Sequence, residues 1–207
     1  MPTHSLVISR RAVRLFTGLC VALLATAALA ATVLAANGTL TRFLVRAGEE
    51  PGFTIAKRQT HLSLKEYLRG DPHARANAKR LKAAGFQTAA FELLKGAHKA
   101  QAGSAVVEFK TSAGARKLTA SQLAAVHKQG AGTYTTIKVP GVPGASGYAF
   151  TASAKNGGAK FRDANVYWVQ GRCSLFVGDL RPGSGSLAMP VIAAVKAVHR
   201  RTGGTCP

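Results

Sequence analysis

Hydrophobic and polar residues alternate with a period of two in several short stretches of the chain, and this spacing is typical of β-strands. Three such stretches follow one another towards the C-terminus: Tyr148 to Ala152, Phe161 to Val169 and Cys173 to Val177. Asn156-Gly157 lies between the first two, and this pair favours a tight hairpin because both central residues of such a turn need positive φ. The pattern therefore predicts an antiparallel meander of three strands.

Two or three further strands are expected upstream of this meander. Ala89 to Leu93, Ala105 to Phe109 and Thr135 to Val139 alternate in the same way. Phe53-Thr54-Ile55 is a candidate for a short strand at the edge of the sheet.

Apolar residues spaced by three and four positions predict helices between the strands. Four helices are predicted, which begin near Leu64, Asp71, Ser112 and Leu187 and end at Gly70, Gly85, Gly130 and Gly203. Asp71 is expected to be an N-cap because Pro72, which follows it, suits the first helical position. Ser112 is expected to cap the third helix.

The order of these elements predicts an α+β domain, in which helices cover an antiparallel sheet. The length of 207 residues suits one such domain with a targeting segment before it. We expect three parts: an apolar N-terminal helix over residues 1–36, a connector over residues 37–59, and the α+β domain over residues 60–207.

The N-terminal part has the pattern of an export signal. Arg10, Arg11 and Arg14 precede a run without charge from Leu15 to Ala36. This run is longer than the roughly 7–15 apolar residues of a secretory signal peptide and close to the ~20 residues that span a membrane. The pattern favours a signal-anchor that holds residues 37–207 outside the cytoplasm, and it leaves open a cleaved signal peptide and a secreted protein.

Cys173 and Cys206 are the two cysteines outside the apolar run. In an exported chain such a pair predicts a disulfide, here between the third meander strand and the C-terminal tail. A catalytic thiol is the alternative, and it is disfavoured because Arg172 is the only activating group next to Cys173 in the sequence.

Basic residues outnumber acidic ones by 28 to 8, which gives a net charge of +20. The leading segment holds only three of the basic residues, so the excess belongs to the rest of the chain. An excess of this size suggests an anionic neighbour, such as a membrane surface or an acidic wall polymer. The predicted contacts lie on the connector and the first long helix: Arg42, Arg46, Lys57, Arg58, Arg75, Lys79, Arg80 and Lys82.

No pattern of catalytic, metal-binding or cofactor-binding residues stands out. The six histidines lack metal-ligand spacing, and Asp163 and Asp179 fall on different meander strands, where we interpret them as satisfied strand-end residues. Gly183-x-Gly185-x-x-Ala188 matches a dinucleotide fingerprint in form, but no second parallel strand can follow it. We therefore expect no enzyme activity, no cofactor, no metal and no nucleic-acid partner.

The order of elements resembles a group of small exported α+β domains of actinobacteria. The residues that carry the resemblance are Ala105 to Phe109 leading into the helix at Ser112, and Val139-Pro140-Gly141 before Val166-Tyr167-Trp168. These domains are the extracytoplasmic sensor-like domain of PknH-type kinases and the LpqN-like lipoproteins. The resemblance implies a membrane-anchored domain that binds a ligand without catalysis. Two alternatives remain: a module that binds polyanions or anionic surfaces, and an exported hydrolase with dispersed active-site residues.

Overall fold

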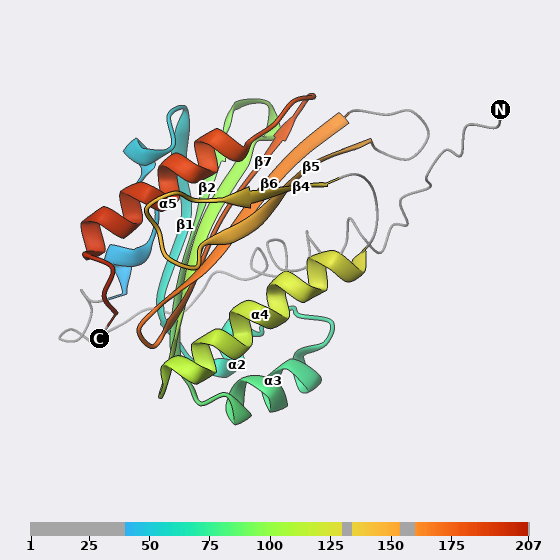
Figure 1. The fold of residues 1–207 in the computed structure, drawn as a ribbon. Helices are drawn as coiled ribbons and strands as arrows, with labels where there is room; N and C mark the ends of the chain where they lie inside the picture. The colour runs from blue at the N-terminus through green and yellow to red at the C-terminus, as the bar shows by residue number, and fades with distance from the viewer. Residues whose placement is uncertain (1–39, 130–133, 154–159, 207) are drawn as a thin grey trace.

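A computed structural model of the chain describes residues 40–129, 134–153 and 160–206 (Figure 1). Seven strands form one sheet in the order β1-β2-β3-β7-β6-β5-β4, and every neighbouring pair is antiparallel. The predicted α+β class with an antiparallel sheet covered by helices is confirmed. The apolar segment and the Asn156-Gly157 turn lie outside the described residues. None of the described helices combines the length and the apolar character needed to cross a bilayer.

The strands are β1 Phe53–Leu62, β2 Phe86–Gly96, β3 Gln101–Phe109, β4 Tyr134–Lys138, β5 Ser146–Ser153, β6 Lys160–Gln170 and β7 Cys173–Pro182. The α-helices are α2 Leu64–Tyr67, α3 Ala74–Ala83, α4 Ser112–Gln129 and α5 Ala188–Thr202, and the 3-10 turns are η1 Thr41–Phe43, η2 Ala47–Glu49 and η3 Ala97–Lys99.

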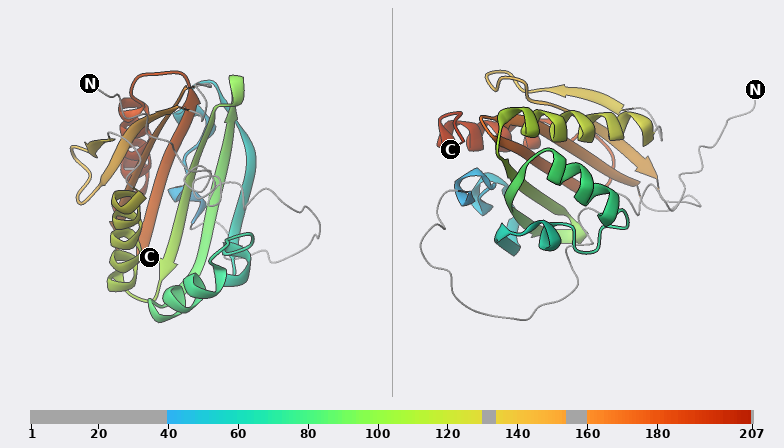
Figure 2. Two further views of the ribbon diagram at one scale, coloured as in Figure 1. Left: turned by 90° about the vertical axis from the view of Figure 1, so that its right-hand side faces the viewer. Right: turned by 90° about the horizontal axis from the view of Figure 1, so that it is seen from below.

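Helices cover both faces of the sheet, which gives three layers. Helix α5 and the turns η1 and η2 lie on one face, whereas α2, α3 and α4 lie on the other (Figures 1 and 2). We call these the α5 face and the α4 face. Because side chains alternate along a strand, β6 directs Val166 and Trp168 into the α5-face core and Val169 towards the α4-face core. Both Val166 and Trp168 are fully buried.

The structure extends the predicted elements at the N-terminal side. The expected edge strand Phe53 to Ile55 is a strand of ten residues, β1, that pairs with β2 along its length. Before it, Leu40 to Glu50 pack on the α5 face, where Phe43, Leu44 and Val45 are buried. Much of the stretch expected to be a connector is therefore part of the folded domain.

Two predicted helix caps are wrong. Helix α3 begins at Ala74 with His73 at the N-cap position, while the Asp71 carboxylate accepts hydrogen bonds from the His73 N–H and the Asn77 amide. Asp71 therefore stabilises a turn that precedes the helix. Ser112 is already inside α4, and the Thr111 hydroxyl accepts the Gly114 N–H at 3.2 Å. Both errors are local, because neighbouring polar residues compete for the same free N–H groups.

The predicted disulfide between Cys173 and Cys206 is present, with Cα atoms 5.9 Å apart. It joins the first residue of β7 to the tail beyond α5 and closes a loop over a sequence separation of 33 residues. Cys173 is fully buried. The bond therefore fixes the end of α5 against the turn between β6 and β7.

Replacement of Cys206 by serine should lower the free energy of unfolding by about 3–4 kcal/mol, because the closed loop restricts the unfolded chain. Urea denaturation with and without reductant measures this. Reductant should destabilise the wild type by a similar amount and leave the Cys206→Ser variant unchanged. Equal stability of the oxidised wild type and the variant would contradict the prediction.

Candidate functional site

The α4 face carries a buried polar pair on strand β6. Asp163 is 4% exposed and Asn165 is 2% exposed. The Asn165 side-chain amide donates a hydrogen bond of 2.7 Å to Asp163 Oδ1. In the register of the sheet, Asp163 lies opposite Phe150 and Leu180, and Asn165 lies opposite Tyr148 and Gly178. The pair therefore lies on β6 between its two neighbouring strands, β5 and β7.

Burial raises the pKa of the Asp163 carboxyl to about 7, and the negative charge of Asp179 adds to the shift. The hydrogen bonds from Asn165 and from the Ala164 N–H act in the opposite direction. None of the ion pairs between described residues includes Asp163. Near neutral pH this carboxyl can therefore both donate and accept a hydrogen bond.

Aromatic rings and glycine backbone surround the pair. Tyr134 and Tyr148 meet edge to face with ring centroids 5.0 Å apart, and Tyr167 contacts Phe176 at the same distance. A Cβ atom at Gly178 would lie 2.5 Å from Asn165 Oδ1 and 2.6 Å from the Phe176 ring. Only glycine leaves room for the amide and the ring, so this position is required for the arrangement.

Helix α4, which packs on the same face of the sheet, carries further polar groups. Helix α4 contacts β6, β7 and β3. Its Thr119 shares a hydrogen bond of 2.7 Å with Ser174 on β7. Gln122, one turn further, has a buried side-chain oxygen without a hydrogen-bond partner. Buried acceptors of this kind are rare in folded proteins and call for a donor.

A second polar cluster lies on the α5 face. Glu50 is 1% exposed and Asp179 is 2% exposed. The Arg181 guanidinium binds Asp179 at 2.6–3.0 Å, contacts Glu50 at 3.4 Å, and lies 4.9 Å over the Phe53 ring. Burial, with a contribution from Asp179, raises the pKa of Glu50 to about 7, and Arg181 opposes the shift. Asp179 is thus satisfied by an ion pair, which agrees with the sequence interpretation, whereas Asp163 is not.

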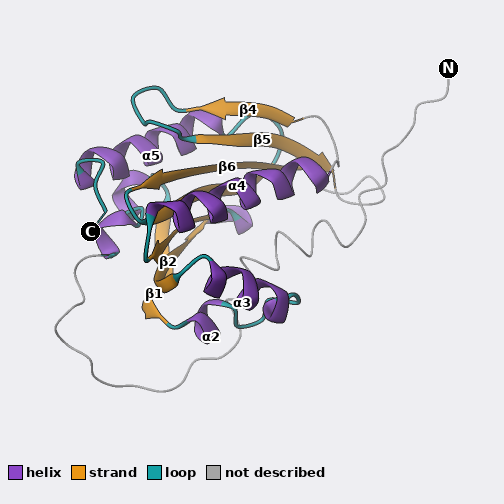
Figure 3. Ribbon diagram, turned by 60° about the horizontal axis from the view of Figure 1, so that its bottom comes forward, coloured by secondary structure: helices purple, strands orange, loops and turns teal. Residues whose placement is uncertain are grey.

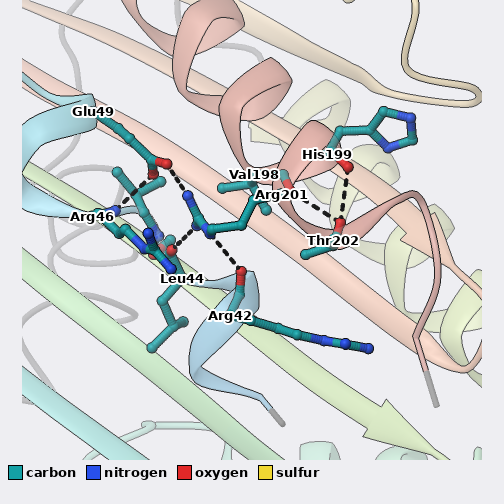
Figure 4. Close-up of polar contacts among 10 residues, drawn as sticks. Arg42, Leu44, Arg46, Glu49, Val198, His199, Arg201 and Thr202 are labelled. Atoms are coloured by element: carbon teal, nitrogen blue, oxygen red, sulfur yellow. Dashed lines mark hydrogen bonds and ion pairs between the residues drawn. The ribbon is translucent and has the colours of Figure 1, made fainter. Parts of the chain in front are cut away.

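A third arrangement fastens the N-terminal segment to α5 (Figure 4). The Arg201 side chain forms an ion pair with Glu49, and it donates to the carbonyl oxygens of Arg42 at 3.1 Å and Leu44 at 2.5 Å. Glu49 also accepts the Arg46 N–H. We call this set of contacts the Arg201 clamp. It holds residues 42–49 against the last turn of α5.

The predicted anion contacts are spread over both faces. On the α5 face, Arg42 lies 5.0 Å over the Phe43 ring, Arg46 is exposed, and Arg58 forms an ion pair with the buried Glu92. On the α4 face, the Lys57 ammonium lies 5.8 Å over the Phe91 ring.

The other four predicted contacts, Arg75, Lys79, Arg80 and Lys82, are exposed on α3. Arg80 donates to Ser121 of α4 and to Asn77. Because α3 covers the α4 face and η1 lies on the α5 face (Figure 3), the eight residues do not form one surface. Arg75, Lys79, Arg80 and Lys82 lie together on α3, whereas Arg42 and Arg46 lie beside the Arg201 clamp.

Sequence reasoning missed the Asp163–Asn165 pair. The available signal was two polar residues two positions apart, on one face of a strand that is otherwise strongly apolar. Glu50 and Arg201 were not singled out. Their partners come from distant parts of the chain, so spacing alone could not reveal them.

No family model matches the sequence, and no curated protein matches it. Among solved structures, the fold is similar to the crystal structure of the extracellular domain of PknH from Mycobacterium tuberculosis. The TM-score is 0.51 at 15% sequence identity, and the match covers 78% of this chain and 95% of that chain. The resemblance expected from the order of elements is therefore confirmed at the level of the fold.

Replacement of Asp163 by asparagine should stabilise the protein above neutral pH. Because the folded-state pKa is raised from about 4 to about 7, the wild type loses stability as pH rises through this window. The gain from Asp163→Asn should reach up to about 4 kcal/mol at pH 8 and vanish near pH 4. Urea denaturation at both pH values measures it, with Asp71→Asn on the surface turn as control. A gain that does not change with pH would contradict the prediction.

Removal of the Arg201 clamp should release the N-terminal segment. Arg201→Ala leaves Glu49 without its ion-pair partner and two carbonyl oxygens without the guanidinium donor, so we expect a loss of about 2–4 kcal/mol. Hydrogen exchange at Phe43 to Val45 should accelerate. Arg200→Ala, at the exposed neighbouring position, should leave both quantities unchanged. Unaltered exchange in the Arg201→Ala variant would show that packing alone holds the segment.

Proposed function

We propose that the folded domain is an extracytoplasmic ligand-binding domain of the sensor type, which binds without catalysis and is held at the membrane by the apolar segment 15–36. The observation that carries the ligand site is the buried carboxyl of Asp163, which has no cationic partner among the described residues. A buried carboxyl without a cationic partner reduces stability when it is charged. A ligand that hydrogen-bonds to it gives a reason for its presence.

The surroundings indicate the chemistry of the ligand. Asp163 near its pKa and the Asn165 amide together offer hydrogen-bond donors and acceptors. The rings of Tyr167 and Phe176 suit the flat or apolar faces of a small molecule. These groups favour a small polar ligand rich in hydroxyl or amine groups.

Two further observations support placement outside the cytoplasm. The Cys173–Cys206 disulfide suits an oxidising compartment. The fold is similar to that of an extracellular domain, although sequence identity is only 15%. The expected absence of catalysis remains a prediction. His199, the histidine next to the Arg201 clamp, contacts the amide of Gln170 and pairs with no carboxylate in the part of the chain that the structure describes.

The experiment follows the side-chain amide of Asn165 by NMR in the purified chain, reconstituted in nanodiscs of neutral lipid. Sugars, amino acids and alkylammonium salts are added one class at a time. At least one class should shift this signal in a saturable manner, with an affinity that changes between pH 6 and pH 8 as Asp163 titrates.

Asp163→Leu should abolish the response, while Asp71→Leu, which removes an acid from the surface turn, should preserve it. A response that survives in Asp163→Leu would place the ligand elsewhere. The absence of any response from all three classes would count against a ligand site at Asp163.

A further inference from the structure

We propose that the end of the domain formed by η1, η2 and the last two turns of α5 docks on anionic lipid headgroups, so that the domain stands on the membrane in one orientation. This inference rests on the membrane anchor of the proposed function. The docking surface comprises Arg42, Arg46, Lys196 and Arg200, and we call it the basic end. Two of these residues, Lys196 and Arg200, were not among the contacts predicted from the sequence.

The length of the chain before Leu40 limits where this end can lie. Only Asn37, Gly38 and Thr39 separate the uncharged run that ends at Ala36 from Leu40. Even fully extended, the four steps from Ala36 to Leu40 span at most about 14 Å. If the uncharged run is in the bilayer, Leu40 must lie close to its surface.

Leu40 is not a free tether point, because the segment that follows it is fixed to the domain. Leu40 itself is 3% exposed in the α5-face core. The Val45 N–H donates to the buried Ser104 hydroxyl at 2.8 Å, and Glu50 contacts Arg181. These contacts and the Arg201 clamp, which Figure 4 shows, fix the segment to the domain. The position of Leu40 therefore determines which end of the domain faces the membrane.

The residues of the basic end form no ion pair with an acid that the structure describes. Arg46 and Arg200 are exposed, and Lys196 lies one helical turn before Arg200 on α5. Burial lowers the pKa of Arg201, and the positive charge of Arg46 adds to this shift. Glu49 is the acid at this end, and Arg201 already neutralises it.

The distribution of the eight acidic residues strengthens this charge imbalance. Glu50, Glu92, Asp163 and Asp179 are buried. The other acids serve internal contacts: Glu49 and Glu108 form ion pairs, Glu66 accepts the Ser63 N–H, and Asp71 binds His73 and Asn77. Few negative charges therefore remain outside to weaken attraction to an anionic surface.

A membrane explains the basic end better than a soluble acidic polymer does. A polymer could bind any of the basic surfaces, including α3. A short anchor, in contrast, brings only one end of the domain close to the membrane. Attraction between basic side chains and anionic headgroups fades within a Debye length of about 8 Å, so only residues at the anchored end benefit. The α3 residues lie on the opposite face of the sheet.

The experiment compares the full chain in nanodiscs of phosphatidylcholine alone with discs that also contain phosphatidylglycerol. The readout is the rate of lysine acetylation at Lys196 and at Lys82 on α3, measured by mass spectrometry. Anionic lipid should slow acetylation of Lys196 by about threefold or more and leave Lys82 unchanged, and high salt should remove the difference.

Two matched double variants locate the contact. Arg46→Glu with Arg200→Glu should abolish the protection of Lys196. Arg75→Glu with Lys79→Glu changes the charge by the same amount on α3 and should preserve it. Equal Lys196 rates on both kinds of disc, or equal protection of Lys82, would overturn the proposal. Protection of Lys196 by soluble polyglutamate but not by anionic lipid would overturn it in favour of an acidic polymer.

An alkaline carbonate wash distinguishes this failure from failure of the anchor. Release of the chain by the wash would overturn both the anchor and the docking surface. A chain that stays in the disc, but whose Lys196 is acetylated equally on both lipids, would overturn the docking surface alone. The ligand response of Asn165 is independent of either result.

Discussion

The fold depends on one constraint, which is that both faces of a seven-stranded antiparallel sheet must be covered. Strand β6 is buried on both sides from Asp163 to Trp168, so neither face of the central sheet can be left to solvent. On one side α4, α2 and α3 supply the cover. On the other side α5 alone is too narrow, and the segment from Leu40 to Glu50 completes the layer. This requirement explains why a stretch with little helical or strand pattern is folded.

Covering the α5 face brings polar groups into the interior, and ion pairs compensate them. Glu50 and Asp179 share Arg181, and Glu92 binds Arg58. Buried carboxylates of this kind are costly unless they are paired, and removal of one partner leaves a charge that is more costly still. Because these acidic residues form buried ion pairs, the surface is left with an excess of basic side chains.

The buried carboxyl groups on the two faces of the sheet have different partners. Asp179 on the α5 face has a tightly bound guanidinium, while Asp163 on the α4 face has only an amide and a backbone N–H. The first arrangement stabilises the attachment of the N-terminal segment. The second leaves a buried carboxyl without a cationic partner among the described residues. This difference separates a structural cluster from a candidate ligand site within one sheet.

The sequence by itself determined the elements that depend on local spacing: the meander, the strands β2, β3 and β4, the amphipathic helices, and a cysteine pair placed to form a bond. Tertiary structure alone decided that β3 lies beside β7, which sets Gly103 next to Gly178, and that Arg201 meets Glu49 across 152 positions. Alternation with a period of two assigns residues to a face but does not choose the neighbouring strand. The partners of the buried acids, the role of Leu40 to Glu50 and the basic end all follow from that choice of neighbours, because each joins residues distant in sequence.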